Sequence, residues 1–367
     1  MIENPTQRLT NRFAFRIEKR ANVTRKDLLL ATGAAILAAL VVTAALMRLA
    51  GANVLDAFDA LWGGAFGSPG SILETLVRTT PLLLCAEAVT VAFRGKIWNI
   101  GAEGQFFCGA IFSYWAYTIF HAWPALPLFG IVVVAGFAGG ALCGWLVAVL
   151  KARFNVDVII STVMMNYIVN YAVYFFLSAY GPWRDPKSFY SYSSEISANA
   201  QWPLIIPQSR LHVGFLIALA SAGVVYLILE KTVLGMKIKA MGFNPIASRF
   251  RGINLAQTLG MVMLISGGIA GLAGAGELFG VQYRLRPDLS PGYGFTGIIV
   301  AMLGGLNPLG VILASLLFGG LLTGSVRMQI ITRVPVALID VIQGIILLFL
   351  LAAQVMAKYQ LKRKEPC

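Results

Sequence analysis

Residues 99–105 have the sequence Asn99-Ile100-Gly101-Ala102-Glu103-Gly104-Gln105 and lie between two long apolar segments. If a helix enters a membrane near Lys96, it carries Glu103 roughly 10 Å deep at about 1.5 Å per residue. A carboxylate at the centre of a bilayer costs about 2.5–3.5 kcal/mol, so this one should face protein or a wet path. Asn99 is suited to cap the helix, and the two glycines permit close approach of a neighbouring backbone. The stretch therefore predicts either a structural helix entry, with Glu103 satisfied by a neighbouring helix, or a turn that lines a solute path.

The composition identifies an integral membrane protein. Of 367 residues, 58% are hydrophobic and only 12% are charged, and the mean hydropathy is +0.76. Soluble domains carry about 25% charged residues, so the chain should be built of many membrane helices. The four cysteines and two histidines show no metal-ligand spacing, which predicts neither a metal site nor a disulfide framework.

Ten apolar segments are counted as crossings, and they predict an all-α polytopic fold. They are residues 28–50, 72–93, 99–120, 125–150, 156–178, 210–229, 255–279, 295–305, 309–325 and 335–357. The connection with Asp56 and Asp59 should lie outside. The eighth segment, with eleven residues, cannot cross about 30 Å of hydrocarbon as a helix unaided, so we expect the eighth and ninth segments to be short or partly re-entrant. The predicted domains are a polar segment 1–27, a permease domain 28–357 and a tail 358–367.

The distribution of basic residues predicts the orientation. With this layout, 20 of the 29 Lys and Arg fall on one side: 7 at the N-terminus, then 2, 2, 5 and 4 in successive connections. Cytoplasmic loops carry such an excess, so both termini should be cytoplasmic. The net charge of +13 follows from this placement and does not indicate nucleic-acid binding.

Two polar stripes run along the fifth segment. Asn166 and Asn170 recur at four-residue spacing, and Tyr167, Tyr171 and Tyr174 recur on the adjacent stripe. Polar side chains are costly in lipid, so we do not expect such stripes to face it. They predict either packing between helices or the lining of a path for a polar, ring-containing solute.

A small-residue seam and several absent motifs narrow the possible chemistry. Gly136, Gly140 and Gly144 recur every four residues and predict tight helix packing, as do Gly267 and Gly271 in a later segment. No stretch matches a Walker-type nucleotide loop, a GxSxG elbow or an HExxH site. We therefore predict no catalytic residue, no metal and no cofactor held by this chain.

Residues 244–254 predict a short, well-bounded helix on the cytoplasmic face. Asn244 can cap it, Pro245 suits its first position, and Gly252 suits its end. The helix would present basic side chains and Phe250 outward. It would either touch lipid headgroups or dock into a cytoplasmic partner.

Three places in the sequence resemble the permease subunits of ABC importers of the ribose/branched-chain amino acid class, in particular the nucleoside and simple-sugar uptake branch. They are residues 96–105, residues 158–167, and the pair 242–254 and 294–305. The resemblance covers roughly residues 28–355. It implies an importer half that pairs with a second permease, which is often a paralogue, around a central path. It further implies two ATPases that use ATP and dock on coupling helices, and an extracytoplasmic solute-binding protein or lipoprotein that delivers the solute.

The leading hypothesis is a permease subunit of a bacterial cytoplasmic (inner) membrane that translocates a nucleoside or a simple sugar. The alternative is a proton-coupled secondary transporter of a neutral polar solute. The residues predicted to lie on the path are Asn99, Glu103, Gln105, Asn166, Tyr167, Asn170 and Tyr171. The residues predicted to couple to the ATPase, from the position that the resemblance gives, are Asn244, Pro245, Ala247, Arg249, Phe250, Arg251 and Gly252.

Overall fold

The computed structural model describes residues 15–19, 25–49, 51–333, 341–342, 344–345, 348–349, 352–353, 356 and 359–363. Contacts divide the chain into two compact units. One unit comprises Met1–Asp59 with Met328–Cys367, and the other comprises Ala60–Arg327. The second unit holds the stretch 99–105 and every other motif singled out above.

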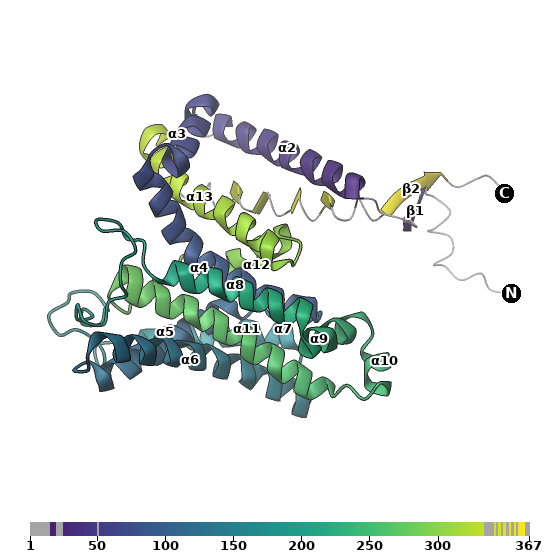
Figure 1. Ribbon diagram of the computed structural model, residues 1–367. Helices are drawn as coiled ribbons and strands as arrows, with labels where there is room; N and C mark the ends of the chain where they lie inside the picture. The colour runs from purple at the N-terminus through teal and green to yellow at the C-terminus, as the bar shows by residue number, and fades with distance from the viewer. Residues whose placement is uncertain are drawn as a thin grey trace. The chain divides into compact units, whose positions relative to one another are not determined.

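Helices dominate the fold (Figure 1). Their bounds are α2 Arg25–Leu49, α3 Val54–Phe66, α4 Pro69–Arg94, α5 Ala102–Phe120, α6 Ala125–Phe154, α7 Val158–Phe176, α8 Gly214–Lys231, α9 Val233–Phe243, α10 Pro245–Phe250, α11 Leu255–Glu277, the π-helix η1 Leu278–Gln282, α12 Tyr293–Leu303 and α13 Pro308–Thr332. Two strands, β1 Phe15–Lys19 and β2 Tyr359–Arg363, pair antiparallel with Phe15 opposite Arg363. The sequence analysis did not predict this strand pair.

The prediction of a polytopic helical membrane protein is confirmed. Among the described residues, six helices are long and apolar enough to cross a membrane: α4, α6, α7, α8, α11 with η1, and α13. The bent pair Gly33–Leu49 and Val54–Phe66 raises the number to seven if it forms one span. The last predicted crossing, 335–357, lies largely outside the described residues.

Two details differ from the prediction. The acidic connection after the first span contains a helix that the sequence analysis did not predict, because Val54–Phe66 form α3. The segment after residue 308 is not short, because α13 continues through the polar residues Ser325, Arg327 and Gln329 to Thr332. By contrast, α12 has only 11 residues and is as short as predicted.

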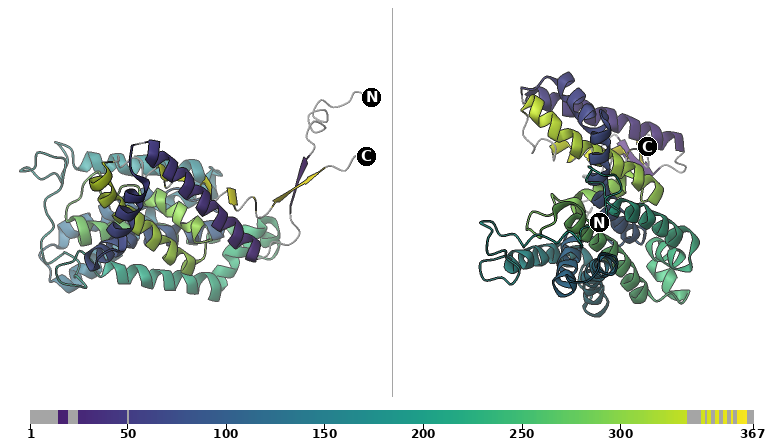
Figure 2. Two further views of the ribbon diagram at one scale, coloured as in Figure 1. Left: turned by 90° about the horizontal axis from the view of Figure 1, so that it is seen from above. Right: turned by 60° about the vertical axis from the view of Figure 1, so that its left-hand side comes forward.

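Glycines allow α5, α6 and α11 to pack backbone against backbone. A Cβ on Gly140 would overlap the carbonyl oxygen of Gly267, and one on Gly144 would overlap that of Met263. A Cβ on Gly136 would lie 2.7 Å from the Cβ of Ala275. The predicted small-residue seam is therefore confirmed, with α6 on one side and α11 on the other. Figure 1 labels these three helices side by side, and Figure 2 gives two further views of the molecule.

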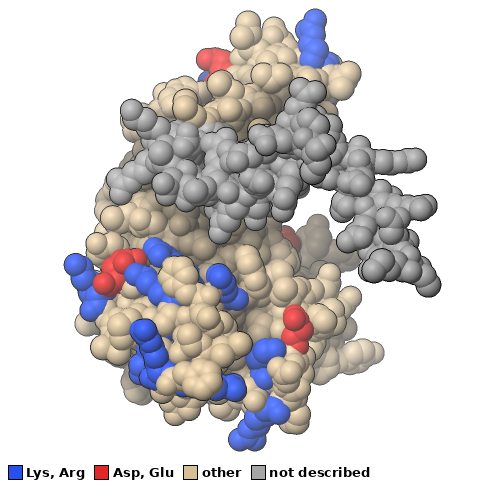
Figure 3. Space-filling view, turned by 90° about the vertical axis from the view of Figure 1, so that its right-hand side faces the viewer, with Lys and Arg blue, Asp and Glu red and all other residues tan. Residues whose placement is uncertain are grey.

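The Ala60–Arg327 unit has two ends of different character. At one end, the basic end, α4, α6 and α8 finish, α5, α7 and α11 begin, and α9 and α10 lie (Figure 1). At the other end, residues 177–213 form a long loop whose Trp202 is buried. Figure 3 views the basic end, where Lys and Arg side chains gather over the surface of this unit.

Candidate functional site

A tight turn connects α4 to α5 at the basic end. Lys96 adopts a left-handed backbone (φ 54°), and the Ile97 amide donates to the carbonyl of Ala92 at 3.1 Å, which closes the end of α4. The chain then turns at residues 99–101 and enters α5 at Ala102. The sequence predicted Asn99 as the N-cap of α5, whereas the structure has Gly101 in this position. The Asn99 Oδ1 nevertheless accepts the Gly101 amide at 2.9 Å.

Asn99 and Gln105 form a buried hydrogen-bonded network. The Asn99 Nδ2 donates to the Oε1 of Gln105 at 3.1 Å and to the Oγ of Ser266 at 2.9 Å. The Ser266 hydroxyl donates in turn to the carbonyl of Ala88 at 2.7 Å. Because a buried amide left unpaired would be costly, this network fixes α4, α5 and α11 relative to one another.

Asn166 holds α7 against the start of α5. Its Oδ1 accepts the Gly104 amide at 2.8 Å, and its Nδ2 donates to the carbonyl of Ile100 at 3.0 Å. A Cβ on Gly104 would lie only 2.9 Å from the Asn166 Cα, so a larger residue at 104 would push the helices apart. Thr162, one turn earlier on α7, accepts the Ile100 amide at 3.3 Å.

Glu103 connects α5 to the start of α12. Its Oε2 accepts the amide of Gly294 at 2.6 Å, and Ser290 lines the same cavity as Glu103. Ser290 also accepts the amides of Gly292 and Tyr293. A Cβ on Gly294 would overlap the backbone of Glu103, so glycine is needed for this approach. The carboxyl group thus lies at the positive end of a helix dipole, where negative charge is favoured.

A cavity of about 580 Å³ opens between α5, α7 and the segment 290–295. Its lining residues are Glu103, Phe107, Val163, Asn166, Tyr167, Asn170, Tyr171, Tyr174, Ser290, Gly292 and Phe295. The structure therefore brings five of the seven predicted path residues together: Glu103, Asn166, Tyr167, Asn170 and Tyr171. Asn99 and Gln105 do not line the cavity and are buried behind it.

The sequence analysis missed part of this lining. Phe107 follows Glu103 by one helical turn, and this spacing could have indicated it. Ser290 and Phe295 come from a polar turn and the glycine-rich stretch after it, which pattern alone could not place against α5. Only the fold brings them within reach.

The cavity offers aromatic rings and neutral hydrogen-bonding groups. Tyr167, Tyr171 and Tyr174 are 59%, 69% and 51% exposed, so their rings are free to meet a ligand. Asn170 adds an amide, whereas the Asn166 amide and the Glu103 carboxyl group are already occupied by backbone contacts. Within the described residues, no group of three His, Cys, Asp or Glu is placed to hold a metal ion.

The predicted short helix at the basic end is confirmed as α10. The Asn244 Oδ1 caps it by accepting the Ala247 amide at 3.0 Å, and Pro245 occupies its first turn. Gly252 ends the turn with φ 80°, which favours glycine. Of the other predicted coupling residues, Arg249 and Arg251 are exposed, and Phe250 is 89% exposed.

The fold and the cavity define a multi-pass membrane protein with a solute-sized opening beside the short helix α12. The family described as "Branched-chain amino acid transport system / permease component" matches residues 71–351. The chain belongs to this family.

Several characterised permeases are similar along most of the chain. The guanosine ABC transporter permease protein NupP of Bacillus subtilis is 37% identical over 328 residues, which cover 89% of this chain and 94% of NupP. The nucleoside ABC transporter permease protein NupB of Lactococcus lactis is 34% identical over 336 residues (90% and 92%). The glucose ABC transporter permease protein TsgB13 of Haloferax volcanii is 30% identical over 335 residues (89% and 87%).

Proposed function

We propose that the chain is the permease subunit of an ATP-driven importer that carries a nucleoside into the cytoplasm. The observation that carries this proposal is the cavity of about 580 Å³ between α5, α7 and residues 290–295. Small-molecule sites commonly measure about 300–1,000 Å³ and combine apolar walls with a few polar groups. The lining of tyrosines, an amide and a hydroxyl fits that description.

A nucleoside suits these groups chemically. Its base can stack on the exposed ring of Tyr167, Tyr171 or Phe295, as bases stack on aromatic side chains elsewhere. Its ribose hydroxyls can exchange hydrogen bonds with Asn170 and Ser290. Glu103 and Asn166 then position the cavity wall, and Asn99 and Gln105 support it from behind. The proposal assigns no catalytic role to any of them.

The relatives support a nucleoside over a sugar as the solute. NupP and NupB are the more similar of the three and are named for guanosine and for nucleosides, whereas TsgB13 is named for glucose. A simple sugar is the second candidate, because an aromatic ring can also pack against a pyranose face. The two solutes differ in size and in the need for stacking, so competition experiments separate them.

The proposal includes partners and a location. ATP is used by separate ATPase subunits that dock on α10, whose exposed Ile246 and Phe250 form an apolar contact surface. A second permease, a paralogue of this chain, packs on the face of α7 that carries the exposed tyrosines, so that the cavity opens onto a shared path. An extracytoplasmic binding protein delivers the solute at the end that carries residues 177–213. The assembly lies in a bacterial cytoplasmic membrane with both chain termini inside.

Competition for uptake tests the solute. Cells that depend on this chain should accumulate radiolabelled guanosine, and excess unlabelled nucleoside should abolish the uptake while glucose leaves it unchanged. Deleting the chain should remove the same uptake. Guanosine uptake that survives deletion, or that glucose alone competes away, would reject the nucleoside proposal.

A further inference from the structure

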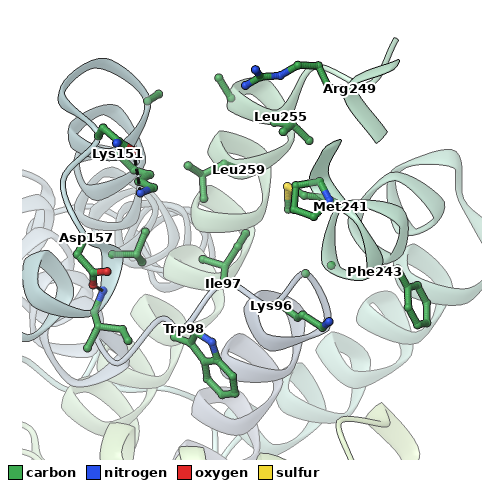
Figure 4. A pocket seen from close by; sticks show the side chains of 18 of the residues that line it. Lys96, Ile97, Trp98, Lys151, Asp157, Met241, Phe243, Arg249, Leu255 and Leu259 are labelled. Carbon is green, nitrogen blue, oxygen red and sulfur yellow. Dashed lines mark hydrogen bonds between the residues drawn. The ribbon is translucent and has the colours of Figure 1, made fainter. Parts of the chain in front are cut away.

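A second cleft of the Ala60–Arg327 unit lies at the basic end, apart from the proposed solute cavity. It has a volume of about 690 Å³ and lies between the turn after α4, the α6–α7 connection and the segment from α9 to α11. In Figure 4, Lys151 and Asp157 lie on one side of it, Met241 and Phe243 on the other, and Leu255 and Leu259 between them.

Four basic residues line the cleft: Lys96, Lys151, Arg153 and Arg249. Within the part of the chain that the structure describes, none of the four makes an ion pair. Asp157 is the single acidic lining residue, and its Oδ1 already accepts the amides of Ile159 and Ile160 at the start of α7. The cleft therefore carries an excess of positive charge that lacks a protein counter-ion.

An excess of basic residues on this side also follows from the positive-inside rule, but that rule does not explain why these four lack an acidic partner among the described residues. Lys151 donates to the neutral Oδ1 of Asn155, at 3.0 Å. Nearby, Arg94 and Lys239 both pair with Glu230. At the same end of the molecule, Glu230 therefore neutralises Arg94 and Lys239, whereas the four basic residues of the cleft have no acidic partner in the described part of the chain. This contrast indicates a ligand that supplies the negative charge.

The walls of the cleft also carry exposed apolar side chains, which a ligand would have to cover. Trp98 and Ile159 are 49% and 40% exposed, and Met241 and Leu259 form the floor. The cleft also lies where four apolar helices, α4, α6, α7 and α11, begin or end, which is the level of lipid headgroups for helices of this kind. An acidic protein segment would match the charge alone. A phospholipid matches both, with an anionic headgroup for the bases and hydrocarbon for Trp98 and Ile159.

We propose that this cleft is a binding site for an anionic phospholipid, whose headgroup phosphate contacts Arg153 and Arg249 and whose acyl chain lies against Trp98. The site borders α10 through Pro245 and Arg249. Bound lipid would therefore stabilise the segment that carries α10 without occupying its outward face.

Fluorescence quenching by brominated lipid tests the proposal directly. The full-length chain, purified with its associated subunits, is placed in phosphatidylcholine vesicles that contain a minor fraction of either brominated phosphatidylglycerol or brominated phosphatidylcholine. The Trp98 signal is the difference between the wild-type protein and Trp98→Phe. Brominated phosphatidylglycerol should quench this signal several-fold more than brominated phosphatidylcholine.

Three variants locate the site. Each basic residue near an anionic headgroup contributes about a fivefold preference, so Arg153→Gln with Arg249→Gln should remove the excess quenching. Arg153→Lys with Arg249→Lys should keep it, because the charge remains. Lys239→Gln is the matched control and should also keep it, because Lys239 is paired with Glu230 and lies outside the lining.

Equal quenching of the wild-type protein by the two lipids would overturn the proposal, and this comparison needs no variant to fold. Excess quenching that survives in the double glutamine variant would overturn it as well. If that variant keeps the lipid preference but loses an associated ATPase, the cleft is a protein-docking surface instead.

Discussion

The Oε2 of Glu103 lies 2.6 Å from the backbone nitrogen of Gly294, and this contact joins residues that are 191 positions apart in the chain. It places a carboxyl group at the first turn of α12, where the helix amides lack intrahelical partners. The segment 290–295 forms one wall of the proposed solute cavity. Glu103 therefore acts on the cavity by holding that wall in position.

Replacing Glu103 tests whether its carboxyl group only positions the wall of the cavity or whether its charge is needed for transport. Glu103→Ala leaves the Gly294 amide buried without an acceptor, at a cost of about 1–3 kcal/mol, and should lower solute uptake at least severalfold. Glu103→Gln keeps an acceptor oxygen and should retain most of the uptake. The measurement is initial uptake rate at matched expression. A glutamine variant as impaired as the alanine variant would show that the charge itself is required.

Tyr171 should contribute a stacking surface. Stacking of a base on an aromatic ring is worth about 1–3 kcal/mol, so Tyr171→Ala should raise the KM for nucleoside uptake about tenfold. Tyr171→Phe keeps the ring and should change it little. Tyr226 lies on α8, outside the cavity lining, so Tyr226→Phe and Tyr226→Ala are the controls. If Tyr171→Ala leaves KM unchanged, the ring does not contact the solute.

Two glycines of α11 provide a matched test of the packing seam. A Cβ at Gly267 would overlap the carbonyl oxygen of Gly140, whereas nothing lies within 4 Å of a Cβ at Gly260. Gly267→Ala should destabilise the protein by about 1–3 kcal/mol, and Gly260→Ala should stabilise it by up to about 1 kcal/mol. Thermal unfolding in detergent measures both. Similar melting temperatures for the two variants would contradict the close approach of α6 and α11.

His212 predicts an acid-sensitive stability. Its Nε2 donates to the carbonyl of Gly276 at 3.0 Å, and burial lowers its pKa from 6.5 to about 4. His212 is therefore protonated below pH 6.5 in the unfolded chain but only below about pH 4 in the folded protein. Stability should be unaffected above pH 6.5 and should fall by about 3 kcal/mol as the pH drops through this window.

The variant His212→Gln isolates that effect, because it removes the titrating group and keeps an amide donor. Melting temperatures should fall more steeply with decreasing pH for the wild-type protein than for the variant. Parallel curves would mean that His212 does not carry the pH dependence.

The sequence predicted much of the fold because the bilayer imposes strong patterns on it. The apolar segments, the glycine seam of Gly136, Gly140 and Gly144, and the capped helix after Asn244 are all local signals. The described residues contain the seam, the capped helix and six or seven of the ten predicted crossings as candidate spans. The helix α3 was missed because Asp56 and Asp59 were interpreted as marks of an exposed connection.

The candidate site was harder to predict because its partners are distant in the chain. The stripe on α7 indicated Tyr167 and Tyr171, yet nothing local showed that Ser290 and Phe295 complete the same cavity. Asn99 and Gln105 were grouped with the path because they are polar residues in a membrane segment. Their hydrogen bonds to each other and to Ser266, which only the packed structure reveals, give them a supporting position instead.

ATP dependence of transport tests the central claim most directly. The chain, purified with its associated subunits and reconstituted in vesicles with its binding protein, should accumulate radiolabelled guanosine only when ATP is supplied to the ATPase side. A protonophore should leave that uptake unchanged, and Phe250→Ala on α10 should abolish it. Uptake that proceeds without ATP and collapses with the protonophore would contradict the importer account and identify a proton-coupled carrier.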